Sequence, residues 1–370
     1  MDMTKKQASD THLFKLAPGD INHLFRHSGV TGNSLSPFQY NAEQAETSSP
    51  SQGFQVLSEH PSFAKISRQL LAPDVKLLCH SGGSVAVEEQ YHILLSVEDA
   101  AVVAHLTNSQ DELVILYFKD METYLHWWVG IYGTEGSDDY AQLFLEQEDI
   151  EVLVCALHCI DIYRRAYMES MLDYRTALDL SINTTDYVQL LKKALGSADL
   201  RWIIASLFEL TPGLKQANIS LKPEHISRVC QQGLLKNSDD SMLTLDKTAV
   251  ALGTEFLLTW MGAVGWRASH LVNGEEHTLA QGLLSATSFA NHMFSFYTED
   301  GSSYRFSHLA GSRAALLKKL HKLLEDLRQK TSGAVLAKPL PHIKRARFCG
   351  QCGSEIRTNN KFCVDCGAPI

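Results

Sequence analysis

The sequence lacks the long apolar runs that mark membrane and secreted proteins. No stretch approaches the roughly 18 consecutive apolar residues that a spanning helix requires, and the opening MDMTKKQASDTHLFKL has no apolar signal region. Cysteine is sparse before the last residues of the chain. Four of the eight cysteines are scattered in apolar surroundings, namely Cys79, Cys155, Cys159 and Cys230. This usage favours a reducing cytoplasm over a disulfide framework, so we expect a cytoplasmic protein with no membrane contact.

Familiar catalytic motifs are also missing. The sequence contains no G-x-S-x-G, no H-E-x-x-H, no Walker loop and no G-x-G-x-x-G. Half of the sixteen histidines lie in or beside apolar segments without a recognisable nucleophile: His80, His92, His105, His126, His270, His277, His292 and His308. The run Ser81-Gly82-Gly83-Ser84 is too short for a phosphate loop and indicates a hairpin turn. We therefore predict that the protein is not an enzyme.

Charge is distributed unevenly. The chain carries a net charge of −9, but residues 313–347 contain ten basic and two acidic residues, and residues 348–370 are balanced. Residues 1–312 therefore carry −17. An acidic region of this size disfavours an extensive nucleic-acid surface, because such surfaces neutralise phosphates. The basic segment that follows, with Lys338, Lys344, Arg345 and Arg347, is a candidate contact for phosphate or for an acidic protein surface, or else a solvated linker.

The pattern of apolar residues predicts an α+β fold with two similar sheet-plus-helix halves around a helical middle. We divide the chain into a weakly structured segment and linker (1–55), a first α/β unit (56–137), a helical middle (138–212), a second α/β unit (213–330), a basic flexible linker (331–347) and a C-terminal ribbon (348–370). The order of elements in the two units is similar enough to predict an ancient duplication.

Within the first unit, a helix over Phe63–Leu71 precedes strands at Val75–Cys79, Val85–Leu95, Ala101–Leu106 and Glu112–Phe118. Asp120 is the expected N-cap of a helix with Tyr124, Trp127, Trp128 and Ile131 on its apolar side. The second unit is expected to begin with a helix at Pro223 and a strand at Met242–Leu245. It continues through apolar segments at Phe256–Trp260 and Val264–Ala268 and a hairpin of Phe289–Tyr297 with Ser303–His308, and it ends in a helix over 312–330.

The strongest motif is at the end of the chain. Cys349-Gly350-Gln351-Cys352-Gly353 is separated by nine residues from Cys363-Val364-Asp365-Cys366-Gly367, and a phenylalanine precedes each pair. Each Cys-x-x-Cys turn presents two thiolates, and two such turns complete a tetrahedral site. Twenty-three residues cannot build a core of their own, so the metal must hold this segment together. We predict one structural Zn²⁺, bound by Cys349, Cys352, Cys363 and Cys366, with no open position for chemistry.

This segment closely resembles the zinc-ribbon family, in the form often attached to the ends of bacterial proteins. The resemblance implies a zinc-stabilised pair of short hairpins used for protein or nucleic-acid contact. Two alternatives stay open: an iron site of the rubredoxin type and a redox-active pair of the thioredoxin type.

Other clusters have simpler interpretations. Cys155, His158 and Cys159 share about one helical turn, and without a further ligand we expect them to pack in the core. The doublets Asp138-Asp139 and Asp239-Asp240 are expected to be solvated loops rather than metal sites. Leucines recur along the helix from Arg313, at Leu316, Leu317, Leu320, Leu323, Leu324 and Leu327, with Lys318, Lys319, Lys322 and Arg328 off this stripe. We expect this helix to pack on the body, the alternative being a docking or coiled-coil helix.

Two functions fit these observations. The first is an adaptor or chaperone-like protein that contacts a protein partner, with the ribbon adding a second contact. The plan of the body resembles that of the chaperones associated with type VII (ESX) secretion. The points of resemblance are Phe63–Pro73, which leads into strands, and Glu112–Phe118, which leads into the tryptophan-containing helix. This resemblance implies a duplicated sheet-plus-helix body that engages helical hairpins. That family lacks a ribbon.

The second function is a nucleic-acid-associated regulator. Residues His225 to Leu245 resemble the end of a winged-helix unit, and residues 338–370 add the basic neck and the ribbon. The helix of this unit offers only Arg228 as a base, whereas a helix that reads a DNA groove usually presents several.

Overall fold

The computed structural model describes residues 10–41, 49–82, 87–106, 112–175, 177–214, 219–238, 241–259, 263–298, 303–336, 347–348 and 355–356. The chain divides into two compact units, Met1–Ser332, here called the body, and Gly333–Ile370. Helices and strands are both abundant in the body, which confirms the α+β class. Within the described residues, no helix combines the length and the apolar character needed to cross a membrane.

An antiparallel sheet forms the centre of the body. Over the described ranges it has ten strands in the order β1-β5-β4-β3-β2-β10-β11-β12-β13-β6. Their bounds are β1 Thr11–Leu16, β2 Val75–Gly82, β3 Val87–Leu95, β4 Val102–Leu106, β5 Leu113–Phe118, β6 Glu148–Asp149, β10 Ala263–Val272, β11 Glu275–Ala286, β12 Asn291–Tyr297 and β13 Arg305–Gly311. The strands alternate between two buried faces, and each face therefore needs its own cover of helices.

The sheet consists of two halves with the same order of elements. The first half runs α5 (Phe63–Leu71), β2 to β5, then α6 (Met121–Tyr132), and the second runs α11 (Lys247–Thr259), β10 to β13, then α12 (Arg313–Leu336). The halves join where β2 pairs antiparallel with β10, with Leu78 opposite Arg267. The predicted repetition of elements is present, and a common ancestry of the halves stays a prediction.

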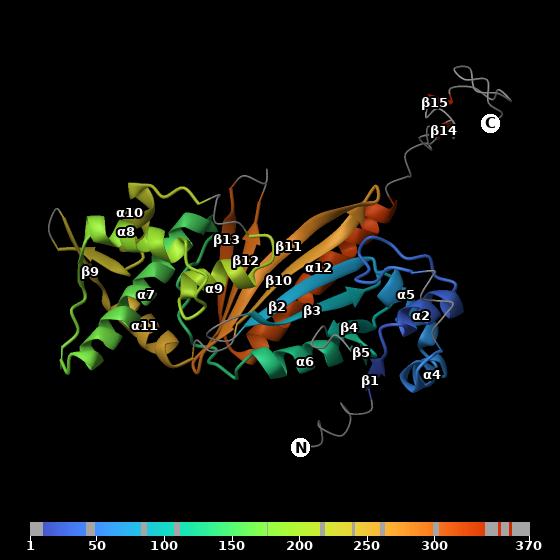
Figure 1. Cartoon of the computed structure of the whole chain (residues 1–370). Helices are drawn as coiled ribbons and strands as arrows, with labels where there is room; N and C mark the ends of the chain where they lie inside the picture. Colours follow the sequence, from blue (N-terminus) through green and yellow to red (C-terminus); the bar gives the residue numbers. More distant parts are fainter. Residues whose placement is uncertain are drawn as a thin grey trace. The chain divides into compact units, whose positions relative to one another are not determined.

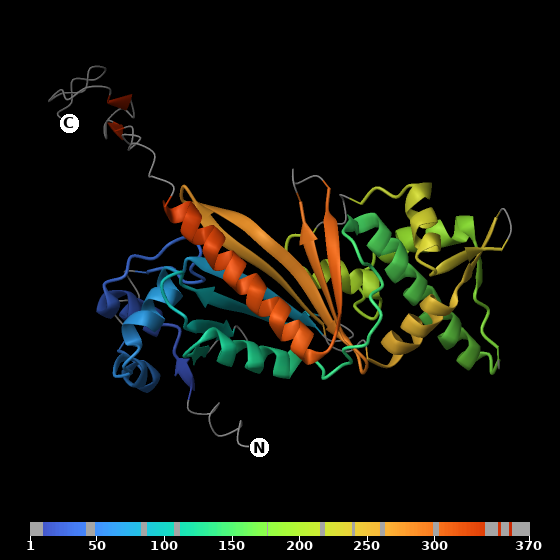
Figure 2. The ribbon, with the colours of Figure 1, turned by 180° about the vertical axis from the view of Figure 1, so that it is seen from behind.

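One face of the sheet is covered by α6 and α12, which lie in front of the strands in Figure 2. Asp120 caps α6 as predicted, since its Oδ1 accepts the backbone N–H of Thr123 at 2.8 Å. Trp128 is buried and donates its indole N–H to the Tyr91 hydroxyl at 2.9 Å. The assignment of Ile131 to the apolar side was wrong, because its side chain is 53% exposed near the end of the helix.

The leucine stripe of α12 packs on the body. Leu316, Leu320, Leu324 and Leu327 are buried in the core beneath α6 and α12, which confirms the closing-helix interpretation. The off-stripe Arg328 donates from Nε and Nη2 to the carbonyl of Ser96, at 3.0 and 2.8 Å. The helix continues to Leu336 rather than ending at Lys330, because the residues after Lys330 contain no proline before Pro339.

The opposite face of the first half is covered by α2 (Asp20–Ser28), α4 (Gln52–Ser58) and α5. The expectation that residues 1–55 are weakly structured was therefore wrong for β1, α2 and the start of α4. Phe14 and Leu16 alternate into the core from β1, which pairs with β5. Asp20 then fastens the segment, because its carboxylate accepts the backbone N–H groups of Ala17 and Ser51 at 2.8 and 2.9 Å.

The second half carries a helical subdomain, defined as residues 150–245, on its opposite face (Figure 1). Its elements are α7 (Ile150–Leu172), β7 (Ser181–Asn183), α8 (Thr184–Leu195), α9 (Ile203–Leu210), α10 (Pro223–Gln231), β8 (Leu235–Asn237) and β9 (Met242–Leu245). The three strands form a separate small sheet in the order β7-β9-β8. The elements at Pro223 and Met242–Leu245, assigned above to the second α/β unit, thus belong to this subdomain instead.

Two glycines allow the helical subdomain to approach closely. A Cβ atom at Gly265 of β10 would lie 2.0 Å from the carbonyl oxygen of Leu210, at the end of α9. A Cβ atom at Gly253 of α11 would lie 2.3 Å from the ring of Tyr163 in α7. Glycine is thus required at both positions, because the neighbouring backbone or ring leaves no room for a Cβ atom.

Candidate functional site

The predicted zinc ligands Cys349, Cys352, Cys363 and Cys366 lie outside the described residues. Two short strands beside them are described: β14 (Arg347–Phe348) pairs antiparallel with β15 (Glu355–Ile356), with Phe348 opposite Glu355. Cys349 follows β14 directly, and Cys352 lies in the same connection between the two strands. The first Cys-x-x-Cys pair therefore lies, in the sequence, between two strands that pair with each other.

The donor set fits Zn²⁺. Four cysteine thiolates in two Cys-x-x-Cys pairs are the ligands of structural zinc sites, and they fill all four tetrahedral positions. Bound zinc would supply cross-linking of the segment and no reactive position. Because the cysteine thiols must lose their protons to bind zinc, the affinity falls as the pH falls.

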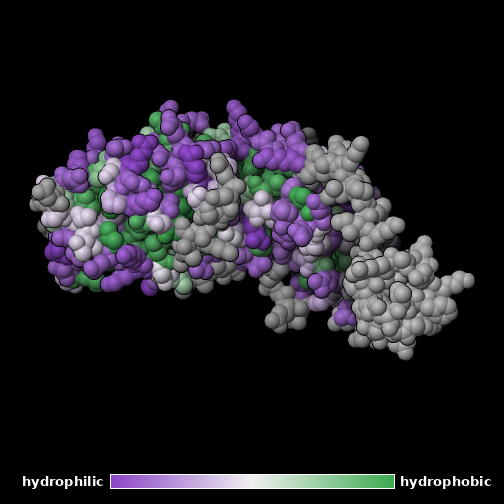
Figure 3. All heavy atoms as spheres, turned by 90° about the horizontal axis from the view of Figure 1, so that it is seen from above, coloured by the Kyte–Doolittle hydropathy of each residue, from purple (hydrophilic) through white to green (hydrophobic). Residues whose placement is uncertain are grey.

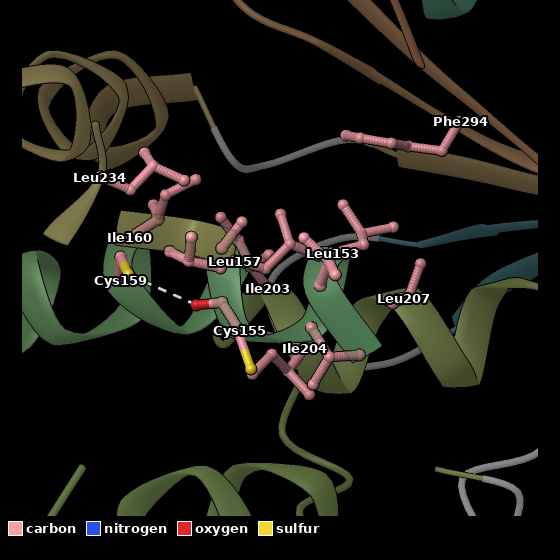
Figure 4. Packing of buried hydrophobic residues seen from close by; sticks show 14 of the residues in the cluster. Leu153, Cys155, Leu157, Cys159, Ile160, Ile203, Ile204, Leu207, Leu234 and Phe294 are labelled. Atoms are coloured by element: carbon pink, nitrogen blue, oxygen red, sulfur yellow. Dashed lines mark hydrogen bonds between the residues drawn. The ribbon is translucent and has the colours of Figure 1, made fainter. Parts of the chain in front are cut away.

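The other cysteines lie in the body. Cys155 and Cys159 are buried in α7 among Leu153, Leu157 and Ile204, and the Cys159 thiol donates to the carbonyl of Cys155 at 3.3 Å (Figure 4). Burial raises the pKa of the Cys155 thiol to about 12 and that of Cys159 further. Core packing is confirmed for this pair, and across the described residues no group of three or more His, Cys, Asp or Glu side chains has the arrangement of a metal site.

The candidate histidines separate into two pairs on neighbouring strands and several dispersed residues. His92 and His105 are cross-strand neighbours on β3 and β4 with stacked rings 5.7 Å apart, and burial lowers the pKa of each to about 4. His80 is nearby on β2, and burial lowers its pKa. The others are dispersed: His126 on the outer side of α6, His270 beside Thr331 of α12, and His277 opposite His270.

The second pair belongs to a hydrogen-bonded group in the interior. His292 Nε2 lies 3.1 Å from Glu255 Oε1, and His292 Nδ1 lies 3.3 Å from His308 Nε2. The Glu255 carboxylate also accepts the hydroxyls of Tyr140, at 2.6 Å, and Thr287. These contacts lower the pKa of Glu255 against the opposing effect of burial. The group ties α11 to β12 and β13, which indicates a structural role.

The acidic doublets show no metal arrangement where they are described. Asp138 accepts the hydroxyl of Ser312, and the backbone N–H of Asp139 donates to Ser137 Oγ at 3.2 Å. These contacts fasten a loop. Asp239 and Asp240 lie outside the described residues. Of the run Ser81–Ser84, Ser81 and Gly82 belong to β2, which pairs antiparallel with β3 as the predicted hairpin requires.

Sequence reasoning missed a site between α7, α8 and α9. Asp161 is buried in α7, and its carboxylate accepts the backbone N–H groups of Ile203 at 3.1 Å and Ile204 at 3.4 Å. It therefore caps α9, whose own N-cap residue Trp202 supplies no capping side chain. Burial raises the pKa of Asp161 to about 7. An aspartate inside the apolar run LVCALHCIDIY was the available signal.

Sequence reasoning also missed a cluster of exposed apolar side chains at the C-terminal end of α7, here called the α7 tip. The exposed fractions are 47% for Met168, 61% for Met171, 78% for Leu172 and 95% for Tyr174. Both ribbon views place this end of α7 at the margin of the body, away from the sheet. Elsewhere, on the face shown in Figure 3, hydrophobic residues are interspersed among hydrophilic ones.

The backbone of the α7 tip has an unusual residue at its turn. Tyr174 N–H donates to Met171 O at 3.3 Å, and Arg175 N–H donates to Ser170 O at 2.8 Å, which together form a Schellman motif. The residue at the left-handed position of this motif is usually glycine, but here it is Tyr174, with φ of 53°. A tyrosine at this position carries a conformational cost, and its side chain is almost fully exposed.

The comparisons with known proteins identify the metal-binding module. Residues 348–370 match the family model of the zinc-ribbon domain, so the C-terminal segment is a zinc ribbon and zinc is the metal that its family implies. No curated protein matches the chain. The comparisons give no support to the resemblance between the body and the ESX-associated chaperones.

Proposed function

We propose that this protein is a non-enzymatic adaptor that binds a protein partner through the α7 tip, with the zinc ribbon as a second contact module. The single observation that carries the proposal is the exposure of Met168, Met171, Leu172 and Tyr174 at one helix end. Large apolar side chains that cluster on a surface are typical of protein-binding sites. Methionine adapts to varied partners, and tyrosine is enriched in interface hot spots.

The conformation of Tyr174 strengthens this proposal. A left-handed tyrosine destabilises the folded state relative to glycine at the same position, by about 1 kcal/mol. Its side chain contributes little packing, because it is 95% exposed. A tyrosine at such a position is readily explained when the ring contacts a partner.

Charge supports a protein partner over nucleic acid for the body. The segment that resembles a winged-helix unit consists of α10 followed by the antiparallel strands β8 and β9. However, the Arg228 guanidinium is held by Glu148, with Nε at 2.9 Å from Oε1. The polar residues that α10 and its N-cap expose are Lys222, Glu224, Ser227 and Gln231, a set with no excess positive charge.

The test uses the full chain as bait, with photo-crosslinking to detect the partner. Leu172→Asp should abolish capture, whereas Leu145→Asp should not, because Leu145 is also exposed, at 87%, but lies outside the α7 tip. Tyr174→Gly should weaken capture while raising the midpoint of thermal unfolding. A partner captured equally by all these variants, or no partner captured by the unsubstituted chain, would contradict the proposal.

A nucleic-acid role is the second candidate, favoured by the basic residues from Lys338 to Arg347 that precede the ribbon. Binding of DNA or RNA that falls steeply with salt and is lost on deletion of residues 334–370 would support it. Association with one protein that persists at high salt would instead support the adaptor.

A further inference from the structure

Two adjoining hollows between α7 and α8 form one groove, here called the α7–α8 groove. The narrower hollow has a volume of about 260 Å³ and the wider one a volume of about 560 Å³. Both are lined by the same four residues at the place where they meet, namely Ile162, Arg165, Leu190 and Lys193. His158 and Ser197 line the narrow end, whereas Glu169 and Asp186 line the wide end. The two helices therefore run in opposite directions along the groove.

Each helix presents one face to this groove. The α8 residues that line it recur at a spacing of three and four residues, namely Asp186, Gln189, Leu190, Lys193 and Ala194. The lining residues of α7 follow the same spacing from His158 to Glu169, over about 16 Å of helix. Ile162 is buried, and Ala166 and Leu190 are half-buried, so the floor is apolar. A groove of this length and character matches an amphipathic helix of about three turns.

The charges on the rims are separated along the groove. On the α7 rim, Arg165 and Glu169 neutralise each other, with 2.7 Å between Nε and Oε1. On the α8 rim, Lys193 and Asp186 are exposed, and neither has an ion-pair partner within the described part of the chain. Lys193 follows Asp186 by seven residues, so the two side chains lie on one face of α8, about 10 Å apart along its axis. The groove thus offers a cation toward its narrow end and a carboxylate toward its wide end.

The wide end reinforces this separation. Asp179 adds a second exposed carboxylate there, while Arg175 is paired with Asp173, at 3.0 Å between Nη2 and Oδ2. The strand β7 also lines this end and is an edge strand of the small sheet. It has only three residues, Ser181–Asn183, so an extended segment would find too short an edge for pairing. A helix uses the whole length of the groove.

The α7 tip borders the groove. Met168 follows Arg165 by three residues and Leu172 follows Glu169 by three, so both lie beside the face of α7 that lines the groove. Arg175, the residue after Tyr174, lines the wide end. A segment that fills the groove would therefore also contact the exposed apolar side chains of the α7 tip.

We propose that the partner inserts an amphipathic helix into the α7–α8 groove, with its apolar face on Ile162, Ala166 and Leu190. An acidic residue near the start of this helix pairs with Lys193, and a basic residue seven positions later pairs with Asp186. This order agrees with the helix macrodipole, which favours acidic residues at the N-terminus and basic residues at the C-terminus, and it makes the helix parallel to α7. The inference rests on the proposed adaptor function, because it names the class of partner that the α7 tip would contact.

The experiment selects peptides that bind the full chain from a displayed library of random sequences of about 16 residues, enough for the helix and both of its ends. We expect enriched peptides with apolar residues at helical spacing and an acidic residue seven positions before a basic one. The double variant Asp186→Lys with Lys193→Glu should bind these peptides about tenfold more weakly, because both ion pairs become repulsive. Exchanging the acidic and basic residues of the peptide should restore binding to this variant. Lys192→Glu is the control, since Lys192 is exposed but does not line the groove, and it should bind the original peptides unchanged.

The proposal is overturned if no peptide is enriched, if the enriched peptides lack helical spacing, or if the double variant binds them like the unsubstituted chain. A dimer of the unsubstituted chain that the double variant dissociates would also overturn it, because a second copy would then fill the groove. Photo-crosslinking separates this inference from the proposed function. A partner that is lost with Leu172→Asp but kept by the double variant would retain the α7 tip as a binding site and exclude the groove. Peptides that bind the groove while the unsubstituted chain captures no partner would instead contradict the adaptor.

Discussion

The body and the ribbon differ in what stabilises them. The body has three clusters of buried apolar side chains on the two faces of its sheet, whereas the ribbon has 23 residues and four cysteines. A segment of that length buries too little apolar surface to fold alone, so its stability must come from the metal. The difference shows that one chain uses two sources of stability, and each source can be removed separately.

The largest expected effect follows from the loss of the zinc ligands. Replacing Cys349 and Cys352 together by serine should unfold residues 348–370, because two neutral hydroxyls cannot replace two thiolates as zinc ligands. The thermal transition of the body should stay nearly unchanged. Calorimetry together with NMR of the variant measures both effects, and a large shift of the body's transition would show that the two units depend on each other.

The next change destabilises the body and leaves the ribbon intact. Gly265→Val should lower the free energy of unfolding of the body by several kcal/mol, because the new Cβ would lie 2.0 Å from the carbonyl oxygen of Leu210. Zinc content should not change. Gly130→Ala is the control, since the nearest atom to its Cβ is a flexible arginine nitrogen at 3.8 Å, and alanine is the better helix former. Equal stability of Gly265→Val and the unsubstituted chain would refute the predicted contact.

Acid should act on the body through buried neutral histidines. Burial lowers the pKa of His105 from 6.5 to about 4, so the folded state binds fewer protons than the unfolded state between these values. The contribution of His105 to the free energy of unfolding is therefore complete above pH 6.5. It falls by at most about 1.4 kcal/mol per pH unit as the pH is lowered toward 4. His105→Leu should therefore flatten the pH dependence of urea unfolding. A His105→Leu variant whose stability depends on pH as steeply as that of the unsubstituted chain would contradict the assignment.

Asp161 should act in the opposite direction. Burial raises its pKa from 3.8 to about 7, against the N–H groups of Ile203 and Ile204 and the charge of Arg164. The folded state thus binds the extra proton, and this group's contribution to stability falls as the pH rises from about 4 to 7. Asp161→Asn keeps an acceptor but does not titrate. The free energy of unfolding of this variant, relative to that of the unsubstituted chain, should increase from pH 5 to pH 7. If the difference between the two free energies stayed constant over this range, Asp161 would be ionised throughout.

The sequence predicted the features that depend on local pattern. Asp120 before an apolar helix, the strands on either side of residues 299–302, and the leucine spacing of α12 all rely on neighbours within a few residues. The Asn273-Gly274 turn between β10 and β11 was an equally local signal that we overlooked, although both residues have the positive φ that this dipeptide favours.

Other features could not be predicted in this way. The pairing of β2 with β10 joins segments almost two hundred residues apart, and no local pattern encodes it. The capping of α9 by Asp161 and the left-handed Tyr174 likewise depend on where the tertiary fold places a residue. The ribbon is the opposite case, because the spacing of its cysteines identifies the motif without any knowledge of the fold.

The metal content of the purified full chain tests the central claim most directly, namely that a core-stabilised body carries a zinc-stabilised ribbon. Elemental analysis of protein prepared without chelator should find one zinc ion per chain, and none in the variant with both Cys349→Ser and Cys352→Ser, while both proteins keep the same thermal transition of the body. An unsubstituted chain without zinc, or with iron in its place, would contradict the account.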